Sequence, residues 1–248
     1  MLSPSFEIPP PRLILGTDEI HIWVAVLEQP VSRLHRLAET LSSEERMKAD
    51  HFHFEKDRRY FTARRGILRT ILGSYLNAES SLVTFRYGRY RKPELNDAFG
   101  NGRIHFNLSH SDWVAVFAFA RDCEIGVDIE FLRDISGMEQ IVEHFFSVRE
   151  NELFGALGEN QKREAFFKGW TCKEAFIKAV GDGLYRPLNR FEVSLLPGEP
   201  TKVLRIEGDA GEACRWSIQE LNPAPNCVGA LAIKAQRFET KCWRWEGM

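Results

Sequence analysis

Apolar residues along the chain form short runs of strand length and longer stretches with helical periodicity. In the first part of the chain, the short runs predict strands at residues 20–27, 104–108, 113–120 and 124–130. Only Arg121, Asp122 and Cys123 separate the last two runs, so we expect these two strands to form a β-hairpin. Further runs predict strands around residues 190–195, 214–221 and 228–234.

Two helix starts are marked by a serine that is followed three positions later by a glutamate, at Ser42 with Glu45 and at Ser147 with Glu150. In such a capping box the serine oxygen accepts a backbone N–H from the third residue on, and the glutamate reaches back to the serine N–H. Long periodic segments follow, which predict helices from about residue 57 to 76 and from about 162 to 180. Gly181 and Gly183 would end the second helix.

These signals occur twice at a similar separation. Ser42 and Ser147 are 105 residues apart, Phe61 and Phe167 are 106 apart, and Gly73 and Gly181 are 108 apart. We therefore expect an α+β chain of two similar halves, residues 1–121 and 122–248, related by pseudo-twofold symmetry with a cleft between them. Each half would be a small, mainly antiparallel sheet packed with helices. Capped helices are common, so coincidence remains the alternative.

Composition and charge narrow the classes of function. The 248 residues carry a formal net charge of −2, so there is no overall basic field of the kind that binds nucleic acid. The five cysteines are scattered without a C-x-x-C pair, which favours a reducing cytoplasm over a disulfide framework or a zinc ribbon. No apolar run of about 18 residues could span a membrane, and the Pro-rich N-terminus lacks the pattern of a signal peptide. We expect a cytoplasmic protein without nucleic-acid or membrane partners.

Two carboxylates lie on one face of the strand predicted at residues 124–130. Asp128 and Glu130 are two positions apart, so their side chains point to the same side, opposite an apolar face. Like charges this close repel unless water or a cation separates them, and Mg²⁺ accepts one or two carboxylates together with substrate phosphates. The alternative is a solvated strand face without a ligand.

A third carboxylate lies on the second long helix. Phe167, Trp170, Glu174 and Lys178 follow each other at spacings of three, four and four, so they form one stripe along the helix. If the aromatic residues point inward, Glu174 and Lys178 point inward or into a cleft, where a carboxylate needs a partner. Glu174 could complete a metal site with Asp128 and Glu130, or it could form a simple ion pair with Lys178.

Several cations and hydroxyl groups could bind phosphate. Ser109 and His110 follow a predicted strand, and cations crowd the helical segments and one loop at Arg46, Lys48, Arg64, Arg65, Arg69 and Lys92. Such local positive charge in a neutral protein suits a polyphosphate ligand. A turn histidine and solvated helix faces are the alternatives.

Taken together, these motifs resemble the Sfp-type 4′-phosphopantetheinyl transferases. The G-x-D-x-E strand of that family stands here at residues 126–130, and its W-x-x-K-E-A-x-x-K helix stands at residues 170–178. The family's asparagine-x-serine-histidine segment is matched by residues 107–110. The resemblance covers roughly residues 20–185 and is greatest to cyanobacterial-type members with broad carrier acceptance.

Two further family motifs lie upstream. The A-x-R-x-x-L-R helix is matched by Ala63, Arg65, Leu68 and Arg69. The lysine–proline pair is matched by Lys92 and Pro93, with Arg91 at the place where the family usually has glycine.

The resemblance implies an active site at the junction of the two halves. The donor would be coenzyme A, and the acceptor a serine of an apo acyl carrier protein or of a peptidyl or aryl carrier domain, with the enzyme acting as a monomer. The N-terminal half would contact the coenzyme A phosphates, and the C-terminal half would carry the metal site and the catalytic helix.

The resemblance also implies roles for single residues. Mg²⁺ would be held by Asp128, Glu130 and Glu174, with Asp128, Glu174 and Lys178 as the catalytic set. Glu174 would be the base for the serine hydroxyl, and Lys178 would contact the pyrophosphate. Coenzyme A would be bound by Arg46, Arg65, Lys92, Ser109, His110 and Lys178. Two other functions use the same residues, namely a Mg²⁺-dependent nucleotide pyrophosphate hydrolase and a non-catalytic protein that binds coenzyme A or the carrier.

Overall fold

The computed structural model describes residues 6–88, 92–99, 103–181, 186–209 and 211–247. Arg91 and Gly183, which carried expectations above, lie outside these ranges. Within the ranges, no helix is long and apolar enough to cross a lipid bilayer.

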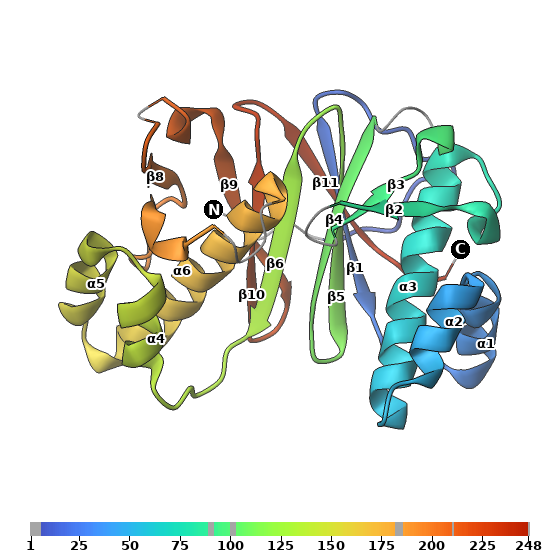
Figure 1. Ribbon diagram of the computed structural model, residues 1–248, viewed down its shortest axis with the longest axis horizontal. Coiled ribbons are helices and arrows are strands. Elements are labelled where there is room, and N and C mark those ends of the chain that lie inside the picture. Colours follow the sequence, from blue (N-terminus) through green and yellow to red (C-terminus); the bar gives the residue numbers. More distant parts are fainter. Residues whose placement is uncertain (1–5, 89–91, 100–102, 182–185, 210, 248) are drawn as a thin grey trace.

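The two halves of the chain run through the same order of elements (Figure 1). The first half consists of β1 (Glu19–Val26), α1 (Val31–Glu39), α2 (Ser43–Asp50), α3 (Glu55–Leu76), β2 (Phe85–Tyr87), β3 (Pro93–Leu95), β4 (Ile104–Ser111) and β5 (Val114–Arg121). The second half consists of β6 (Ile125–Phe131), α4 (Met138–Phe145), α5 (Val148–Gly155), α6 (Glu159–Val180), β7 (Phe191–Val193), β8 (Val203–Ile206), β9 (Ser217–Ala224) and β10 (Cys227–Ile233). The strand β11 (Glu239–Arg244) follows without a counterpart.

The two main sheets repeat one topology. Their strand orders are β11-β1-β5-β4 and β6-β10-β9, so β1-β5-β4 in the first half corresponds to β6-β10-β9 in the second. These pairs are all antiparallel, whereas the added strand β11 pairs in parallel with β1. The expected α+β fold of two similar halves is therefore confirmed. The division at residues 121 and 122 stays a prediction, and β11 crosses it to join the first half's sheet.

The predicted hairpin between residues 113–120 and 124–130 is wrong. The strand β5 pairs with β4 and β1, whereas β6 pairs with β10 in the other sheet. The tight turn lies one strand earlier, where Asp112 takes a left-handed conformation (φ 43°) between β4 and β5. Both edges of β5 are thereby occupied, so the next strand has to start the second sheet.

The central core lies between the two sheets. It is made of buried aliphatic side chains from both, including Ile22, Val116, Val127 and Leu231. The long helices α3 and α6 pack on the outer faces, which explains why β5 is apolar on both of its faces (Figure 1). Burial of such side chains from water is the main stabilising contribution to this arrangement.

Both predicted capping boxes are present. The Ser42 hydroxyl accepts the N–H of Glu45, whose side chain accepts the N–H of Ser42, and Ser147 and Glu150 repeat this pattern. The helices α3 and α6 are each 22 residues long and begin two and three residues before the predicted starts. Their first turns are polar, so hydrophobic periodicity does not detect them.

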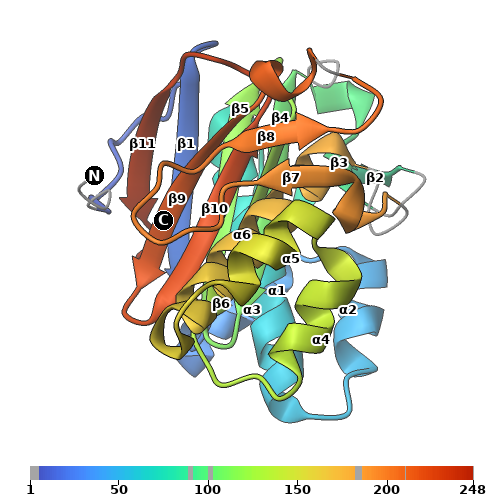
Figure 2. The same cartoon turned by 90° about the vertical axis from the view of Figure 1, so that its left-hand side faces the viewer.

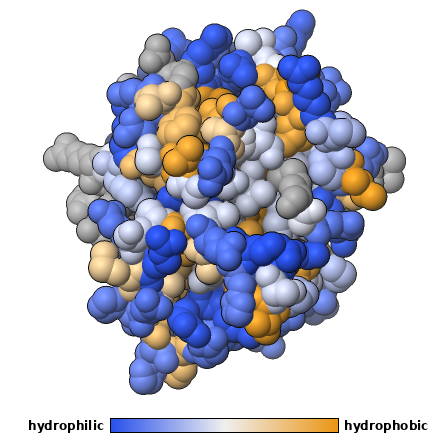
Figure 3. All heavy atoms as spheres, turned by 90° about the vertical axis from the view of Figure 1, so that its right-hand side faces the viewer, coloured by the Kyte–Doolittle hydropathy of each residue, from blue (hydrophilic) through white to orange (hydrophobic). Residues whose placement is uncertain are grey.

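Helices and a β-hairpin form the outer layer of the second half (Figure 2). Figure 2 shows α4 and α5 lying beside α6, with the β7–β8 hairpin next to them. On the opposite side of the molecule, the surface is mainly hydrophilic and its apolar side chains form separate patches (Figure 3).

Candidate active site

The strand β6 has one paired edge and one edge that faces β4. It pairs with β10 on one side only, and its place in the centre of the molecule puts its free edge at the junction of the two halves (Figure 1). The helix α6 crosses closely over its start, since a Cβ atom on Gly126 would lie 2.1 Å from the carbonyl oxygen of Ala175. The glycine of the G-x-D-x-E motif is therefore required for the approach of helix and strand.

Asp128 is buried rather than solvated. Only 5% of its surface is exposed, which rules out for this residue the alternative of a solvated strand face. Its Oδ1 atom accepts hydrogen bonds from Ser109 Oγ at 2.9 Å and from Lys178 Nζ at 2.5 Å. Its Oδ2 atom is buried and has no hydrogen-bond partner among the residues that the structure describes. A buried carboxylate oxygen without a donor is costly, so this atom is suited to receive a cation.

Glu174 is half-buried beside this group and, among the described residues, forms neither a hydrogen bond nor an ion pair. Burial, followed by the negative charge of Asp128, raises its pKa. Lys178 turns to Asp128 and not to Glu174, so the alternative of a Glu174–Lys178 ion pair is not what forms. A carboxylate with a raised pKa at a junction can take up a proton.

Glu130 is the third carboxylate of the expected metal site. Its Oε2 atom accepts hydrogen bonds from Ser111 at 3.1 Å and from Arg133 at 2.9 Å. Asp128 is likewise bound by Lys178. Within the described ranges, no three His, Cys, Asp or Glu side chains lie close enough together to hold a metal ion in their present positions. The donor set nevertheless fits Mg²⁺, because hard carboxylate oxygens are present and Asp128 Oδ2 lacks a partner.

A basic pocket of about 900 Å³ lies in the first half, between α2, α3 and the strands that follow. Arg65 and Arg69 line it, and both bind Glu45, the glutamate of the capping box. Arg65 also donates to the Tyr87 hydroxyl and stacks on the ring of Phe85 at 4.1 Å. The predicted phosphate ligand Arg65 is therefore already committed to a buried carboxylate.

Arg64 is a pocket residue that the sequence did not single out for coenzyme A. It is half-buried, lines the pocket and has no hydrogen-bond or ion-pair partner among the described residues. Burial, with the neighbouring charge of Arg65, lowers its pKa to about 10. The sequence placed Arg64 among the cations that could bind phosphate, but the family motif matched its neighbour Arg65. In the structure Arg65 and Arg69, four residues apart, share the helix face toward Glu45, and Arg64 points elsewhere.

His110 lies near this free guanidinium. Although His110 is exposed, desolvation of its ring by the surrounding residues lowers its pKa to about 4, and the charges of Arg64 and Lys178 add to the effect. His110 is therefore neutral near pH 7 in a locally positive field, which an anionic ligand would offset.

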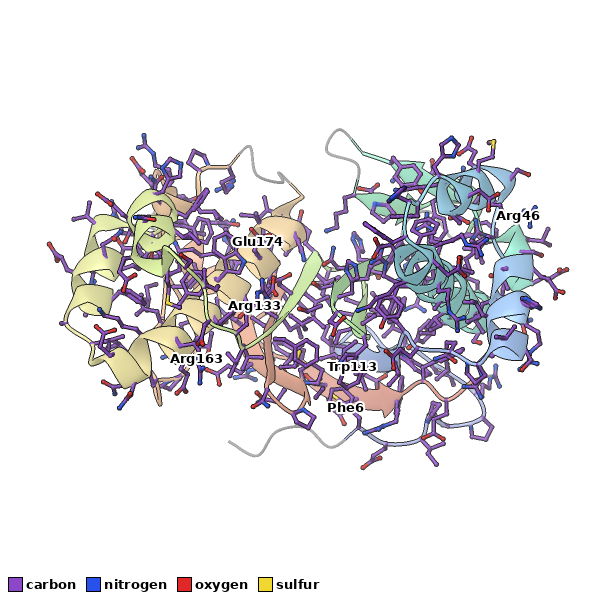
Figure 4. The ribbon with its side chains drawn as sticks, turned by 90° about the horizontal axis from the view of Figure 1, so that it is seen from below. Phe6, Arg46, Trp113, Arg133, Arg163 and Glu174 are labelled. Carbon is purple, nitrogen blue, oxygen red and sulfur yellow. The ribbon has the colours of Figure 1, made fainter. Side chains whose placement is uncertain are left out.

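Two predicted coenzyme A contacts lie elsewhere. The Lys92 ammonium group donates to the carbonyls of Ile125, Lys178 and Ala179 at 3.2, 2.6 and 3.2 Å, so it caps the end of α6. Burial lowers its pKa to about 8. Arg46 lines a separate pocket of about 280 Å³ between α1, α2 and α3. Figure 4 shows it at the far side of the first half, away from Glu174.

Comparison with known proteins gives a consistent result. The sequence model of the 4′-phosphopantetheinyl transferase superfamily matches residues 124–232, and that of the N-terminal part of 4′-phosphopantetheinyl transferases matches residues 29–121. The 4′-phosphopantetheinyl transferase HetI of Nostoc sp. is 44% identical over 245 residues, which cover 99% of this chain and 100% of that protein.

More distant relatives match smaller parts. The 4′-phosphopantetheinyl transferase Sfp of Bacillus subtilis is 31% identical over 70% of this chain and 76% of its own length. The human L-aminoadipate-semialdehyde dehydrogenase-phosphopantetheinyl transferase is 28% identical over 79% of this chain and 67% of its own length.

Proposed function

From the fact that this chain belongs to the 4′-phosphopantetheinyl transferase superfamily, we infer how its own residues carry out the transfer. The enzyme moves the 4′-phosphopantetheine part of coenzyme A to a carrier protein. We propose that the acceptor is a serine of an apo acyl carrier protein or of a peptidyl or aryl carrier domain. The enzyme would act as a cytoplasmic monomer, and its five free cysteines support that location.

The single observation that carries the site assignment is the unpartnered Oδ2 atom of buried Asp128, next to the unpaired carboxylate of Glu174. Asp128, Glu130 and Glu174 would hold Mg²⁺, which when bound neutralises pyrophosphate charge and aligns the phosphorus for attack. Lys178 would leave Asp128 and donate instead to the departing nucleotide. The Lys178 ammonium group, which is bound to Asp128 in this structure, thus shows that a cation is favourable at this position.

The phosphate contacts are proposed for the basic pocket. Arg64 and His110 would bind the 3′-phosphate of coenzyme A, because Arg64 is unpaired and its charge already acts on His110. Arg65 would support this pocket by holding Glu45 in place. Ser109 would keep its hydrogen bond to Asp128. Lys92 would contribute by fixing the end of α6, which carries Glu174 and Lys178. Arg46 would be no more than a peripheral contact.

The chemical step follows from these positions. The serine oxygen of the carrier forms a bond to the phosphorus that bears pantetheine, and the bond from that phosphorus to the bridging oxygen breaks. The leaving group is adenosine 3′,5′-bisphosphate. Glu174 would take up the serine proton, directly or through a water molecule.

The proposal is tested by incubating the protein with coenzyme A, Mg²⁺ and a panel of apo-carriers, followed by intact mass measurement. We expect each accepted carrier to gain one phosphopantetheine group, and a carrier with its acceptor serine changed to alanine to gain none. Cleavage of coenzyme A without any gain by a carrier would instead support the hydrolase. Binding of coenzyme A without cleavage would support the non-catalytic protein.

A further inference from the structure

The backbone N–H groups on the free edge of β6 donate to side chains of β4 and not to the backbone of β4. Val127 N–H donates to Asn107 Oδ1 at 2.9 Å, Ile129 N–H to Ser109 Oγ at 3.4 Å and Phe131 N–H to Ser111 Oγ at 3.2 Å. We call these three hydrogen bonds the seam between the halves. The backbone groups of β4 and β6 form no ladder with each other, since the two strands belong to different sheets.

The spacing of the seam follows from strand geometry. Asn107, Ser109 and Ser111 are two residues apart on β4, so their side chains leave the strand on the same side. The three N–H groups that they satisfy are also two residues apart on β6. A side chain reaches farther than a backbone carbonyl, so the seam satisfies an exposed strand edge while keeping the two backbones apart. Three matched bridges also fix the register of β6 against β4.

Each serine of the seam makes a second hydrogen bond. The Ser109 hydroxyl donates to Asp128 Oδ1 at 2.9 Å, and the Ser111 hydroxyl donates to Glu130 Oε2 at 3.1 Å. A hydroxyl has one donor and two acceptor positions, so a single serine can hold a backbone N–H and a carboxylate together. The seam therefore sets both the register of β6 against β4 and the direction of the Asp128 and Glu130 side chains.

We propose that Asn107 and Ser111 are positioning residues that hold Asp128 and Glu130 in the geometry for the ion, an inference that rests on the proposed function. Ser111 would touch neither coenzyme A nor the reacting atoms, whereas Asn107 also lines the basic pocket proposed for coenzyme A. Asn107 would fix the register through Val127, and Ser111 would orient Glu130, which Arg133 binds from the other side. A carboxylate held on both sides loses less freedom when an ion binds.

The experiment compares Ser111→Ala with Ser111→Thr, which restores the hydroxyl. Ser217→Ala is the matched control, because Ser217 is also half-buried and its hydroxyl donates to the Ala235 carbonyl on the far edge of the second sheet. The measurements are Mn²⁺ binding by electron paramagnetic resonance, hydrogen exchange of the Phe131 amide, and the KM for coenzyme A.

We expect Ser111→Ala to weaken Mn²⁺ binding about tenfold, since a hydrogen bond to a charged group is lost. Exchange at Phe131 should accelerate, while the KM for coenzyme A should stay within about twofold. Ser111→Thr should recover both properties, and Ser217→Ala should change neither. Asn107→Leu, which removes the acceptor at similar size, should weaken Mn²⁺ binding as well.

Unchanged Mn²⁺ binding in Ser111→Ala, together with a lower melting temperature, would overturn the inference by showing a structural role alone. Mn²⁺ binding and amide exchange do not depend on turnover. If the wild-type protein binds Mn²⁺ but fails to modify any carrier, the proposed function fails while the seam is still tested.

Discussion

The first strands of the two halves, β1 and β6, occupy equivalent places in equivalent sheets, but their outer edges are treated differently. The edge of β1 is covered by β11, which pairs with it in parallel from Glu19 opposite Glu239 to Val24 opposite Arg244. Lys241 of β11 adds an ion pair with Glu19. The edge of β6 receives no strand and is bound by side chains instead, through the seam and through Lys92 and Lys178, whose ammonium groups donate to the carbonyls of Ile125 and Val127.

Within one repeated fold, the edge of β1 therefore has a structural role, and the edge of β6 carries the candidate active site. At β1 a backbone ladder with β11 covers that edge from Glu19 to Val24. At β6 the side-chain bridges leave Asp128 with an unpartnered oxygen, next to Glu174. We therefore propose that catalysis takes place at the edge of β6, which lacks a neighbouring strand.

The long helices α3 and α6 also differ between the halves, but here it is the first half that has the more open arrangement. Lys173 of α6 and Arg69 of α3 both lie fourteen residues after the first residue of their helix, and each binds the capping-box glutamate of its own half. Around Glu45 the arrangement opens onto the basic pocket, whereas Lys173 is completely buried with Glu150. In the first half, the capping-box glutamate and its arginines therefore line the basic pocket. In the second half, the capping-box glutamate and its lysine are part of the buried interior.

The largest effect is expected at Glu174. In Glu174→Gln the shape of the side chain is kept, but the charge and the proton acceptor are lost. The single-turnover transfer rate should fall by about 10²–10⁴-fold. The matched control is Thr70→Val at the equivalent position of α3, where the Thr70 hydroxyl only donates to the Gly66 carbonyl of its own helix. Its rate should stay within about threefold of wild type. Similar losses in both variants would remove the functional distinction between the helices.

The next effect concerns stability and compares Lys173→Met with Arg69→Met. In the part of the chain that the structure describes, Lys173 is the one cation paired with Glu150, so its removal should lower the free energy of unfolding by about 3–5 kcal/mol. Glu45 keeps Arg65 when Arg69 is lost, so Arg69→Met should cost only about 1–2 kcal/mol. Urea unfolding of both variants measures the difference. Equal costs would mean that the two caps are equivalent in energy as well as in geometry.

The smallest effect concerns pH. The pKa of His110 is lowered to about 4 in the free protein by desolvation and by Arg64 and Lys178, so a bound phosphate should raise it. Binding then takes up a proton, and the affinity for coenzyme A should rise as the pH falls. Between pH 8 and 6.5 we expect the dissociation constant to decrease about threefold.

Calorimetry across this range, with 3′-dephospho-coenzyme A as the control ligand, measures the effect. His110→Gln should flatten the pH dependence for coenzyme A and leave that of the control ligand unchanged. A dependence that persists in His110→Gln would assign the proton to another group.

Local signals in the sequence predicted local structure well. The capping boxes at Ser42 and Ser147 depend on atoms three residues apart, and both are present. The shared face of Asp128 and Glu130 follows from the two-residue period of a strand, and the predicted fold of two halves followed from repeated local signals. The roles of the individual site residues stay predictions.

Partners that are distant along the chain were not predictable. The choice of β4 over β6 as the hairpin partner of β5 depends on which strand edges are free in the folded chain. Lys92 resembles a phosphate ligand in sequence, but its position at the end of α6 depends on a contact 86 residues away. The same applies to Lys178, which lies 50 residues from Asp128 and binds it in preference to its own helix neighbour Glu174.

The most direct test of the account is whether the edge of β6 binds a divalent ion. Mn²⁺ binding, measured by electron paramagnetic resonance with coenzyme A present, would be compared between the wild-type protein and Asp128→Asn, which keeps the side-chain shape but removes its charge. We predict one bound ion per wild-type chain and at least about tenfold weaker binding in Asp128→Asn. Equal Mn²⁺ affinity in the two proteins, with both correctly folded, would contradict the assignment of catalysis to this edge.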